Sequence, residues 1–78
     1  MTVALIEYVA PWLVDHPDDV EIAEVTGDGD TLILEISVNP EDMGKIIGRQ
    51  GRIIRALRTV ARAAGQRDGQ PVTIEVVD

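Results

Sequence analysis

The sequence predicts one small domain of the α+β class, with elements in the order helix, strand, strand, helix, helix, strand. Three observations carry this prediction. The chain has 78 residues, of which 45% are hydrophobic, and this suits a single packed core. Residues 31–38 and 71–77 alternate apolar and polar side chains, as half-buried strands do. Residues 52–64 place apolar side chains on one side of a helix and arginines on the other.

The first element is a predicted helix over residues 2–14, where apolar residues dominate without strand-like alternation. Pro11 lies inside this segment and is expected to kink the helix or to end its first half. Apolar side chains surround most of the helix, which is more than one contact face requires. Residues 16–19, His-Pro-Asp-Asp, are expected to close it as a turn.

Two strands, residues 20–26 and 31–38, are predicted on either side of Gly27–Asp30, whose Gly-Asp-Gly-Asp sequence is a hairpin signal. The second strand is the clearer one, because its even-numbered positions from 32 to 38 are all apolar. In the first strand Val25 is out of phase with Ile22. A bulge or an early end of the strand is therefore expected there.

Asn39 and Pro40, followed by two acids, form a typical helix start. Glycines then predict where the helical segments end. The expected order is a short helix over 40–47, an interruption at Gly48–Gly51, a helix over 52–64 ended by Gly65, a polar loop over 66–70, and a last strand opened by Pro71.

Charge is strongly segregated along the chain. Residues 1–44 carry eleven acidic and no basic side chains, residues 45–67 carry seven basic and no acidic ones, and residues 68–78 add three acids, for a net charge of −7. This indicates one face that meets an anion on a body that repels it. A dipole that neutralises itself during folding or self-association is the alternative interpretation of the same pattern.

The helix over 52–64 and the glycine loop before it form the candidate site. Four arginines without an acid share one helix face, where like-charge repulsion would be relieved by an external anion. The Gly48–Gly51 loop precedes a helix N-terminus, which favours phosphate groups. Taken alone, the Gly-x-x-Gly spacing is more typical of a simple helix connection.

The wider context is more specific. Residues 46–54, Ile-Ile-Gly-Arg-Gln-Gly-Arg-Ile-Ile, resemble the signature of the KH domain, and residues 40–48 and 55–60 resemble the small bacterial single-KH proteins of the KhpA (YlqC-like) family. The resemblance covers the whole chain and is strongest over residues 39–60. It implies a type II (bacterial) KH fold, with a three-stranded sheet and helices packed on one face. The expected domain is 1–78.

The resemblance also implies single-stranded RNA as the partner, with the loop clamping the backbone of about four nucleotides and the bases in an apolar groove beside a sheet edge. Gly48, Arg49, Gln50 and Gly51 form the expected clamp, with Lys45, Arg52 and Arg55 as flanking phosphate contacts. Ile46, Ile47 and Ile54 are groove or core residues, and the sequence does not distinguish these roles. The implied function is a post-transcriptional regulator or RNA chaperone acting in a dimer. The expected protein partner is a second copy or a Jag-type (KhpB) RNA-binding protein.

Other sites are poorly supported. A Walker phosphate loop would need Gly-Lys-Ser/Thr where the chain has Gly44, Lys45 and Ile46, and a dinucleotide fingerprint would need a preceding strand. The hairpin acids Asp28 and Asp30 lack the further ligands of a calcium loop. The single histidine, His16, is expected to be a surface residue. We therefore expect no enzyme activity, cofactor or metal.

Two alternative functions fit the same sequence. One is a helix-turn-helix-like DNA reader, with the helix over 52–64 in a major groove. The other is a protein-protein interaction module that binds no nucleic acid. The chain has no cysteine, no apolar run long enough to span a membrane and no signal-peptide pattern, so a cytoplasmic location is expected.

Overall fold

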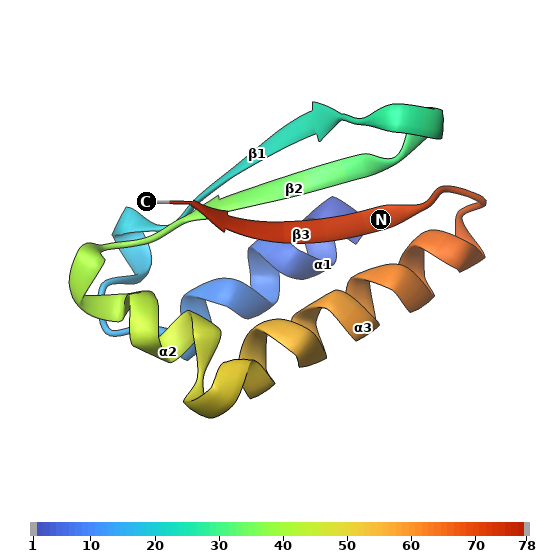
Figure 1. Cartoon of the computed structure of the whole chain (residues 1–78). Coiled ribbons are helices and arrows are strands. Elements are labelled where there is room, and N and C mark those ends of the chain that lie inside the picture. Colours follow the sequence, from blue (N-terminus) through green and yellow to red (C-terminus); the bar gives the residue numbers. More distant parts are fainter. Residues whose placement is uncertain (1, 78) are drawn as a thin grey trace.

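The computed structural model describes residues 2–77 and confirms the α+β architecture (Figure 1). Three helices cover one face of a three-stranded sheet. Met1 and Asp78, which belong to the predicted domain, lie outside the described residues. The elements are α1 (Thr2–Val9), β1 (Glu21–Thr26), β2 (Leu32–Ser37), α2 (Met43–Ile47), α3 (Arg52–Arg67) and β3 (Val72–Val77).

The sheet has the strand order β1-β2-β3, with β2 antiparallel to β1 and parallel to β3. A parallel pair needs a long crossover, and α2, the Gly48–Gly51 loop and α3 supply it. This mixed sheet with its helices on one face agrees with the architecture that the resemblance to type II KH domains implies. Over residues 2–77 no helix has both the length and the apolar character needed to cross a bilayer.

The core lies between the sheet and the helices. Leu34, Ile36 and Ile74 point from the sheet toward Ile6 of α1 and Ile46 of α2, and all five are fully buried. The alternating pattern of the second and third strands therefore reports the buried face correctly. Burial of one such aliphatic side chain contributes about 1.5–3 kcal/mol, so these residues fix the orientation of α1 and α2 against the sheet.

The prediction of a bulge or an early end in the first strand is wrong. The register of β1 with β2 runs without interruption from Glu21 opposite Ser37 to Thr26 opposite Leu32. Val25 pairs with Ile33 on the outer face of the sheet, which none of the described helices covers. Its phase differs from that of Ile22 because the two side chains lie on opposite faces of the same regular strand.

Pro11 ends the first helix as predicted. The α-helix stops at Val9, and residues Ala10–Leu13 continue as a 3₁₀ turn. The helix start at Asn39 is also confirmed, since its side chain accepts a hydrogen bond of 2.9 Å from the Glu41 N–H. The first turn there, Pro40–Asp42, is 3₁₀ rather than α.

The predicted end of the long helix near Ala64 is wrong, because α3 continues through Gly65 to Arg67. Gly65 is buried where the helix meets the start of β3. A Cβ at this position would lie 2.4 Å from the Gln70 carbonyl oxygen and 2.7 Å from Val72 Cγ2. Glycine here permits close packing of a helix on a strand, and the helix ends beyond it.

Candidate nucleic-acid interface

The Gly48–Gly51 loop connects α2 to α3 through three residues with positive φ angles. Gly48 has φ 78° and ψ 171°, Gln50 has φ 57° and ψ 26°, and Gly51 has φ 74° and ψ 19°. The N–H of Gly51 bonds to the Gly48 carbonyl at 3.1 Å, which closes the turn. The loop is thus a tight turn, with two residues in the left-handed region, that presents the side chains of Arg49 and Gln50 to solvent.

Gly48 is also closely packed against Ile53, in addition to its positive φ angle. A Cβ on this residue would lie 2.6 Å from Ile53 Cγ1 and 2.9 Å from the Ile53 nitrogen. The backbone of the loop therefore lies directly on the first turn of α3. This contact holds Arg49 and Gln50 in front of the helix N-terminus.

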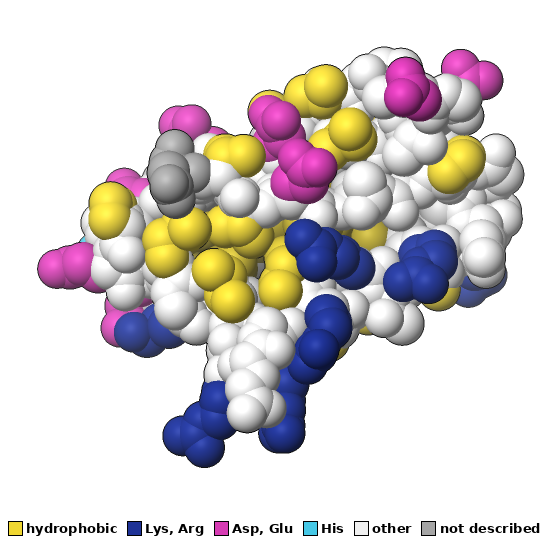
Figure 2. Space-filling model, in the orientation of Figure 1, with side chains coloured by type: hydrophobic (Ala, Val, Ile, Leu, Met, Phe, Trp, Pro, Cys, Tyr) yellow, Lys and Arg dark blue, Asp and Glu magenta, His cyan; other side chains and the backbone are white. Residues whose placement is uncertain are grey.

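The electrostatics of this end of the molecule favour an anion. The sixteen-residue helix α3 begins right behind the loop and has no acid in its first turn, so its positive dipole end is not neutralised. Arg49, Arg52 and Arg55 are exposed around it. Figure 2 shows the dark blue basic side chains along this lower edge, while the magenta acids gather over the sheet and at the far left.

A match to a protein-family model decides the family. The model is described as KhpA/KhpB, KH domain, and it matches residues 3–76. The chain belongs to this family of KH domains.

Curated relatives agree over nearly the whole chain. An RNA-binding protein KhpA of Clostridium acetobutylicum is 51% identical over 73 residues, which are 94% of this chain and 96% of the relative. The RNA-binding protein KhpA of Leifsonia xyli subsp. xyli is 44% identical and covers 100% of this chain and 99% of its own length.

Solved structures of Era share the fold. The Aquifex aeolicus Era Y63A structure bound to GDP.AlF4- matches with a TM-score of 0.61 and 24% identity, covering 96% of this chain and 29% of that chain. A structure of Era in complex with MgGDPNP and nucleotides of 16S ribosomal RNA matches with a TM-score of 0.60 over 28% of its chain.

Within this KH domain the three candidate isoleucines separate into core and surface. Ile46 is fully buried and Ile54 is 7% exposed, so both belong to the core. Ile47 is 36% exposed, and the helical spacing puts it on the side of α2 away from Lys45. Of the three, Ile47 is therefore the residue that can meet a ligand. Figure 2 shows yellow hydrophobic surface between the sheet edge and the basic loop end.

Lys45 forms an ion pair with another part of the chain. Its Nζ lies 3.2 Å from Asp15 Oδ2, in the segment after the first helix. Both side chains are largely exposed, so this ion pair is weak. A phosphate contact by Lys45 stays a prediction, and it would compete with Asp15.

Arg58 has a contact that the sequence does not predict. Helical periodicity identifies it only as one of the four arginines on the same face of the helix. Its Nε donates a hydrogen bond of 2.9 Å to the Ile74 carbonyl of β3. Because β3 is an edge strand of the sheet formed by the described residues, it pairs with a strand on one side only. Arg58 thereby ties α3 to β3, and its remaining N–H groups are available to a ligand.

Behind the site, Asp42 anchors α2 to the segment that follows the first helix. It is fully buried and accepts hydrogen bonds from the backbone N–H groups of Asp15 (3.3 Å) and His16 (2.9 Å), with the His16 ring nitrogen Nδ1 at 3.1 Å. His16 is thus a structural partner of a buried carboxylate, half-exposed at the surface. Asp42 acts as this anchor in addition to its place in the first turn.

The two residues hold shifted pKa values. The hydrogen bond to Asp42, helped by the charges of Asp42 and Glu41, raises the pKa of His16. Burial alone would raise the pKa of Asp42, but the hydrogen bonds from His16 and Asp15 outweigh burial and lower it. Asp42 is therefore ionised at neutral pH. Its role is to hold the base of α2, and so the start of the loop, in place.

Proposed function

We propose that this chain binds single-stranded RNA, with the Gly48–Gly51 loop gripping the phosphate backbone. The observation that carries the proposal is the loop itself, a tight turn with exposed Arg49 and Gln50 set on the acid-free N-terminus of α3. Arg52 and Arg55 extend the cationic surface along the helix. The bases would lie against Ile47 and the open edge of β3.

The same site explains why the strand would be single. A nucleobase can contact the exposed edge of β3 only when its own hydrogen-bonding groups are not paired with another base. In addition, Arg58 bridges the surface between α3 and β3. Duplex recognition in a helix-turn-helix manner would require α3 to enter a major groove with free base-reading side chains. Arg58 is instead committed in part to β3. Equal-length single-stranded RNA and duplex DNA, compared in one binding assay, discriminate between these functions.

The decisive variant is Arg49→Asp together with Gln50→Asp, with both glycines retained. Two carboxylates then face the phosphates in place of one cation, so RNA binding measured by fluorescence polarisation should be nearly abolished. The fold should be unharmed, because Asp tolerates the left-handed conformation at position 50 and acids near a helix N-terminus are stabilising by about 0.3–1 kcal/mol.

The matched control is Arg67→Asp, which reverses one arginine at the opposite end of α3. It should keep RNA binding close to that of the parent. Normal binding by the double-Asp variant, with a normal thermal melt, would exclude the loop as the RNA clamp. If the chain is instead a module that binds only protein, the unmodified protein itself should not bind RNA.

We also propose that the chain acts as a dimer, with a second copy or a Jag-type (KhpB) RNA-binding protein, and serves as a post-transcriptional regulator or RNA chaperone. Two observations support this proposal. Trp12 and Tyr8 in the first helical segment are 76% and 68% exposed with ring centroids 6.5 Å apart. An apolar face between that segment and α3 carries a hollow of about 350 Å³, and its lining includes Val9, Leu13 and Val60.

Association through this face is tested with Val60→Glu, which puts a charge at a 44% exposed position of α3. The exposed Ala63→Glu serves as the control on the same helix. Light scattering should show an oligomer for the parent and the control, and a monomer for Val60→Glu. A monomeric parent at high concentration, with no co-purifying protein, contradicts this part of the proposal.

A further inference from the structure

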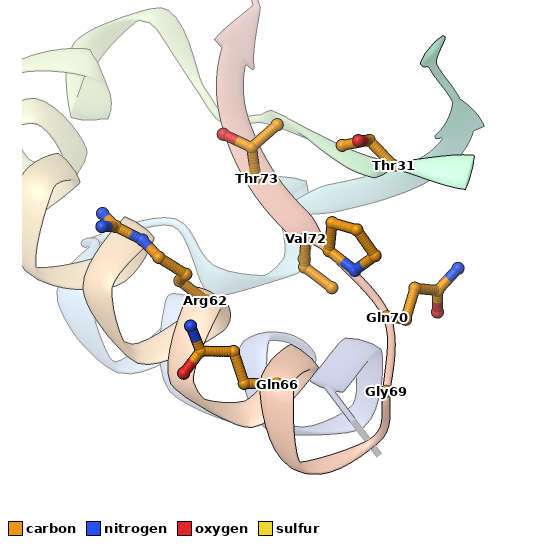
Figure 3. A pocket seen from close by; sticks show the side chains of 8 residues that line it. Thr31, Arg62, Gln66, Gly69, Gln70, Val72 and Thr73 are labelled. Carbon is orange, nitrogen blue, oxygen red and sulfur yellow. The ribbon is translucent and has the colours of Figure 1, made fainter. Parts of the chain in front are cut away.

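A second hollow lies at the other end of α3 from the loop, where the helix faces the start of β3 (Figure 3). We call it the α3–β3 hollow. Its volume is about 610 Å³, and it is open to solvent. Its lining includes Arg62, Gln66, Gln70, Val72, Thr31 and Thr73. The loop residues 48–51 do not line it, so it is separate from the site described above.

The backbone around this hollow is held by hydrogen bonds and by close packing. Gly65 allows the helix to touch the turn, and the Gln70 N–H bonds to the Gly65 carbonyl at 2.8 Å. The N–H groups of Asp68 and Gly69 bond to helix carbonyls at 3.1–3.2 Å, and Leu32 of β2 donates to the Pro71 carbonyl at 2.8 Å. A ligand would therefore meet a preformed surface, with little ordering of the backbone.

The chemistry of the lining suits a nucleotide. Val72 and Pro71 form an apolar floor on which a base or ribose can lie. The Gln66 carboxamide offers both donors and an acceptor, as the edge of a nucleobase requires. Arg62 is exposed and supplies one cation, enough for one phosphate. In Figure 3 the Arg62 and Gln66 side chains extend from α3 on the helix side of the hollow, whereas the Gln70 side chain extends to the opposite side of the start of β3.

A strand that leaves the clamp along α3 would reach this hollow. Arg58, Arg62 and Gln66 follow one another at four-residue spacing, so they form a row on one face of α3. From Arg52 to Gln66 the helix rises about 21 Å. The outer face of the sheet carries the neighbouring acids Glu35 and Glu75 and would repel a phosphate strand. The row along α3 is therefore the favoured route.

We propose that the α3–β3 hollow is a second RNA subsite, which takes one nucleotide of the same strand beyond those held at the loop. Arg62 contacts its phosphate, and Gln66 hydrogen-bonds its base. The inference rests on the proposed RNA binding and extends it to a longer footprint. Short oligonucleotides would occupy the clamp alone, whereas longer ones would occupy both sites.

The test compares a tetranucleotide with an octanucleotide, both of random sequence, by fluorescence polarisation. The variant is Arg62→Ala with Gln66→Ala, two exposed helix positions where Ala preserves the helix. Arg67→Ala is the control, because it removes the same charge from the same helix but lines a different hollow. Longer oligonucleotides offer more registers, so the comparison that counts is variant against parent on each length.

We expect the variant to match the parent on the tetranucleotide and to bind the octanucleotide at least about fivefold more weakly, as the loss of a phosphate contact and a hydrogen bond implies. The Arg67→Ala control should match the parent on both. In the parent, the side-chain amide NMR signals of Gln66 should shift with the octanucleotide and stay unmoved with the tetranucleotide.

Equal octanucleotide affinity in the variant and the parent would overturn the second subsite, as would amide signals that the octanucleotide leaves unmoved. Tetranucleotide binding would survive either result, so the loop clamp would stand. A parent that binds neither length refutes the clamp and the subsite together.

Discussion

Gly48 has two separate reasons to be glycine, whereas Gly51 has one. At Gly48 the backbone lies in a region open almost only to glycine, and a Cβ would collide with Ile53 at 2.6 Å. At Gly51 the backbone is left-handed, but the nearest side-chain atom is Ile54 Cγ2, 3.8 Å from the position of a Cβ. The two ends of the loop therefore differ in their tolerance of a side chain.

The expected result is that Gly51→Ala destabilises the fold by about 1–2 kcal/mol, the cost of a left-handed non-glycine residue. Gly48→Ala should be worse, at about 3 kcal/mol or more, because backbone strain and overpacking both apply. Urea unfolding of the two variants gives the comparison. Equal losses would show that the Gly48–Ile53 contact does not constrain the loop.

The pair of His16 and Asp42 predicts a stability maximum at mildly acidic pH. The Asp42 pKa is lowered, so its contribution is present above the ordinary value of 3.8 and is lost as the pH falls through the folded pKa. The His16 pKa is raised, so its contribution is complete below 6.5 and is lost as the pH rises through the folded pKa. Both contributions are present between these values.

Asp42→Asn should lower the unfolding midpoint and remove the decline on the alkaline side, because the main cause of the His16 shift is gone. Glu41→Gln, which changes an exposed neighbour 3.6 Å from His16 Nε2, should keep that decline. Urea midpoints measured across a pH series that brackets 6.5 provide the check. An alkaline decline that persists in Asp42→Asn would assign it to another group.

At the level of elements, two helical glycines should respond in opposite directions to alanine. Gly44 in α2 is exposed, and a Cβ there would have open space around it to 4 Å. Gly44→Ala should therefore stabilise by about 0.5–1 kcal/mol through helix propensity. Gly65→Ala should destabilise, since overpacking against Gln70 and Val72 costs about 1–3 kcal/mol and exceeds the same gain. Thermal melts of both variants measure the signs, and stabilisation by Gly65→Ala would contradict the close packing of α3 on β3.

The elements that the sequence predicts well are those specified by local patterns. Alternation along β2 and β3, the Asn39 cap and the Pro11 break act within a few residues, and each appears in the structure. Gly65 was not predictable as a mid-helix residue, because the neighbours that require it, Gln70 and Val72, are set by tertiary packing.

In the candidate site, too, some features can be predicted from local sequence and others depend on tertiary packing. The loop and its cations follow from sequence, and the family match agrees with the resemblance that the motif suggested. The exposed position of Ile47 and the bond from Arg58 to Ile74 depend on how α3 lies along the sheet edge. Helical periodicity alone gives the arginine stripe but does not say which arginine meets β3.

For the molecule as a whole, folding converts the segregated charges of the chain into opposed surfaces. The seven basic residues all lie between residues 45 and 67, on α2, the loop and α3, whereas Glu35 and Glu75 lie side by side on the sheet. A phosphate strand is attracted at the loop and repelled by the acidic surface over the sheet. The net charge of −7 therefore limits affinity without preventing binding.

Salt dependence measures how many phosphates this arrangement contacts. If about three phosphates meet the loop and the start of α3, the logarithm of the affinity for a tetranucleotide should fall with the logarithm of salt concentration with a slope near −2. An octanucleotide that also meets Arg62 should add one phosphate and steepen the slope by about 0.7. Polarisation titrations of the parent at several salt concentrations, with Arg62→Ala alongside, give both slopes. Because Arg62→Ala removes the added contact, it should return the octanucleotide slope to the tetranucleotide value. An affinity that does not change with salt would contradict phosphate gripping at the loop, since binding would then rest on the apolar surface around Ile47.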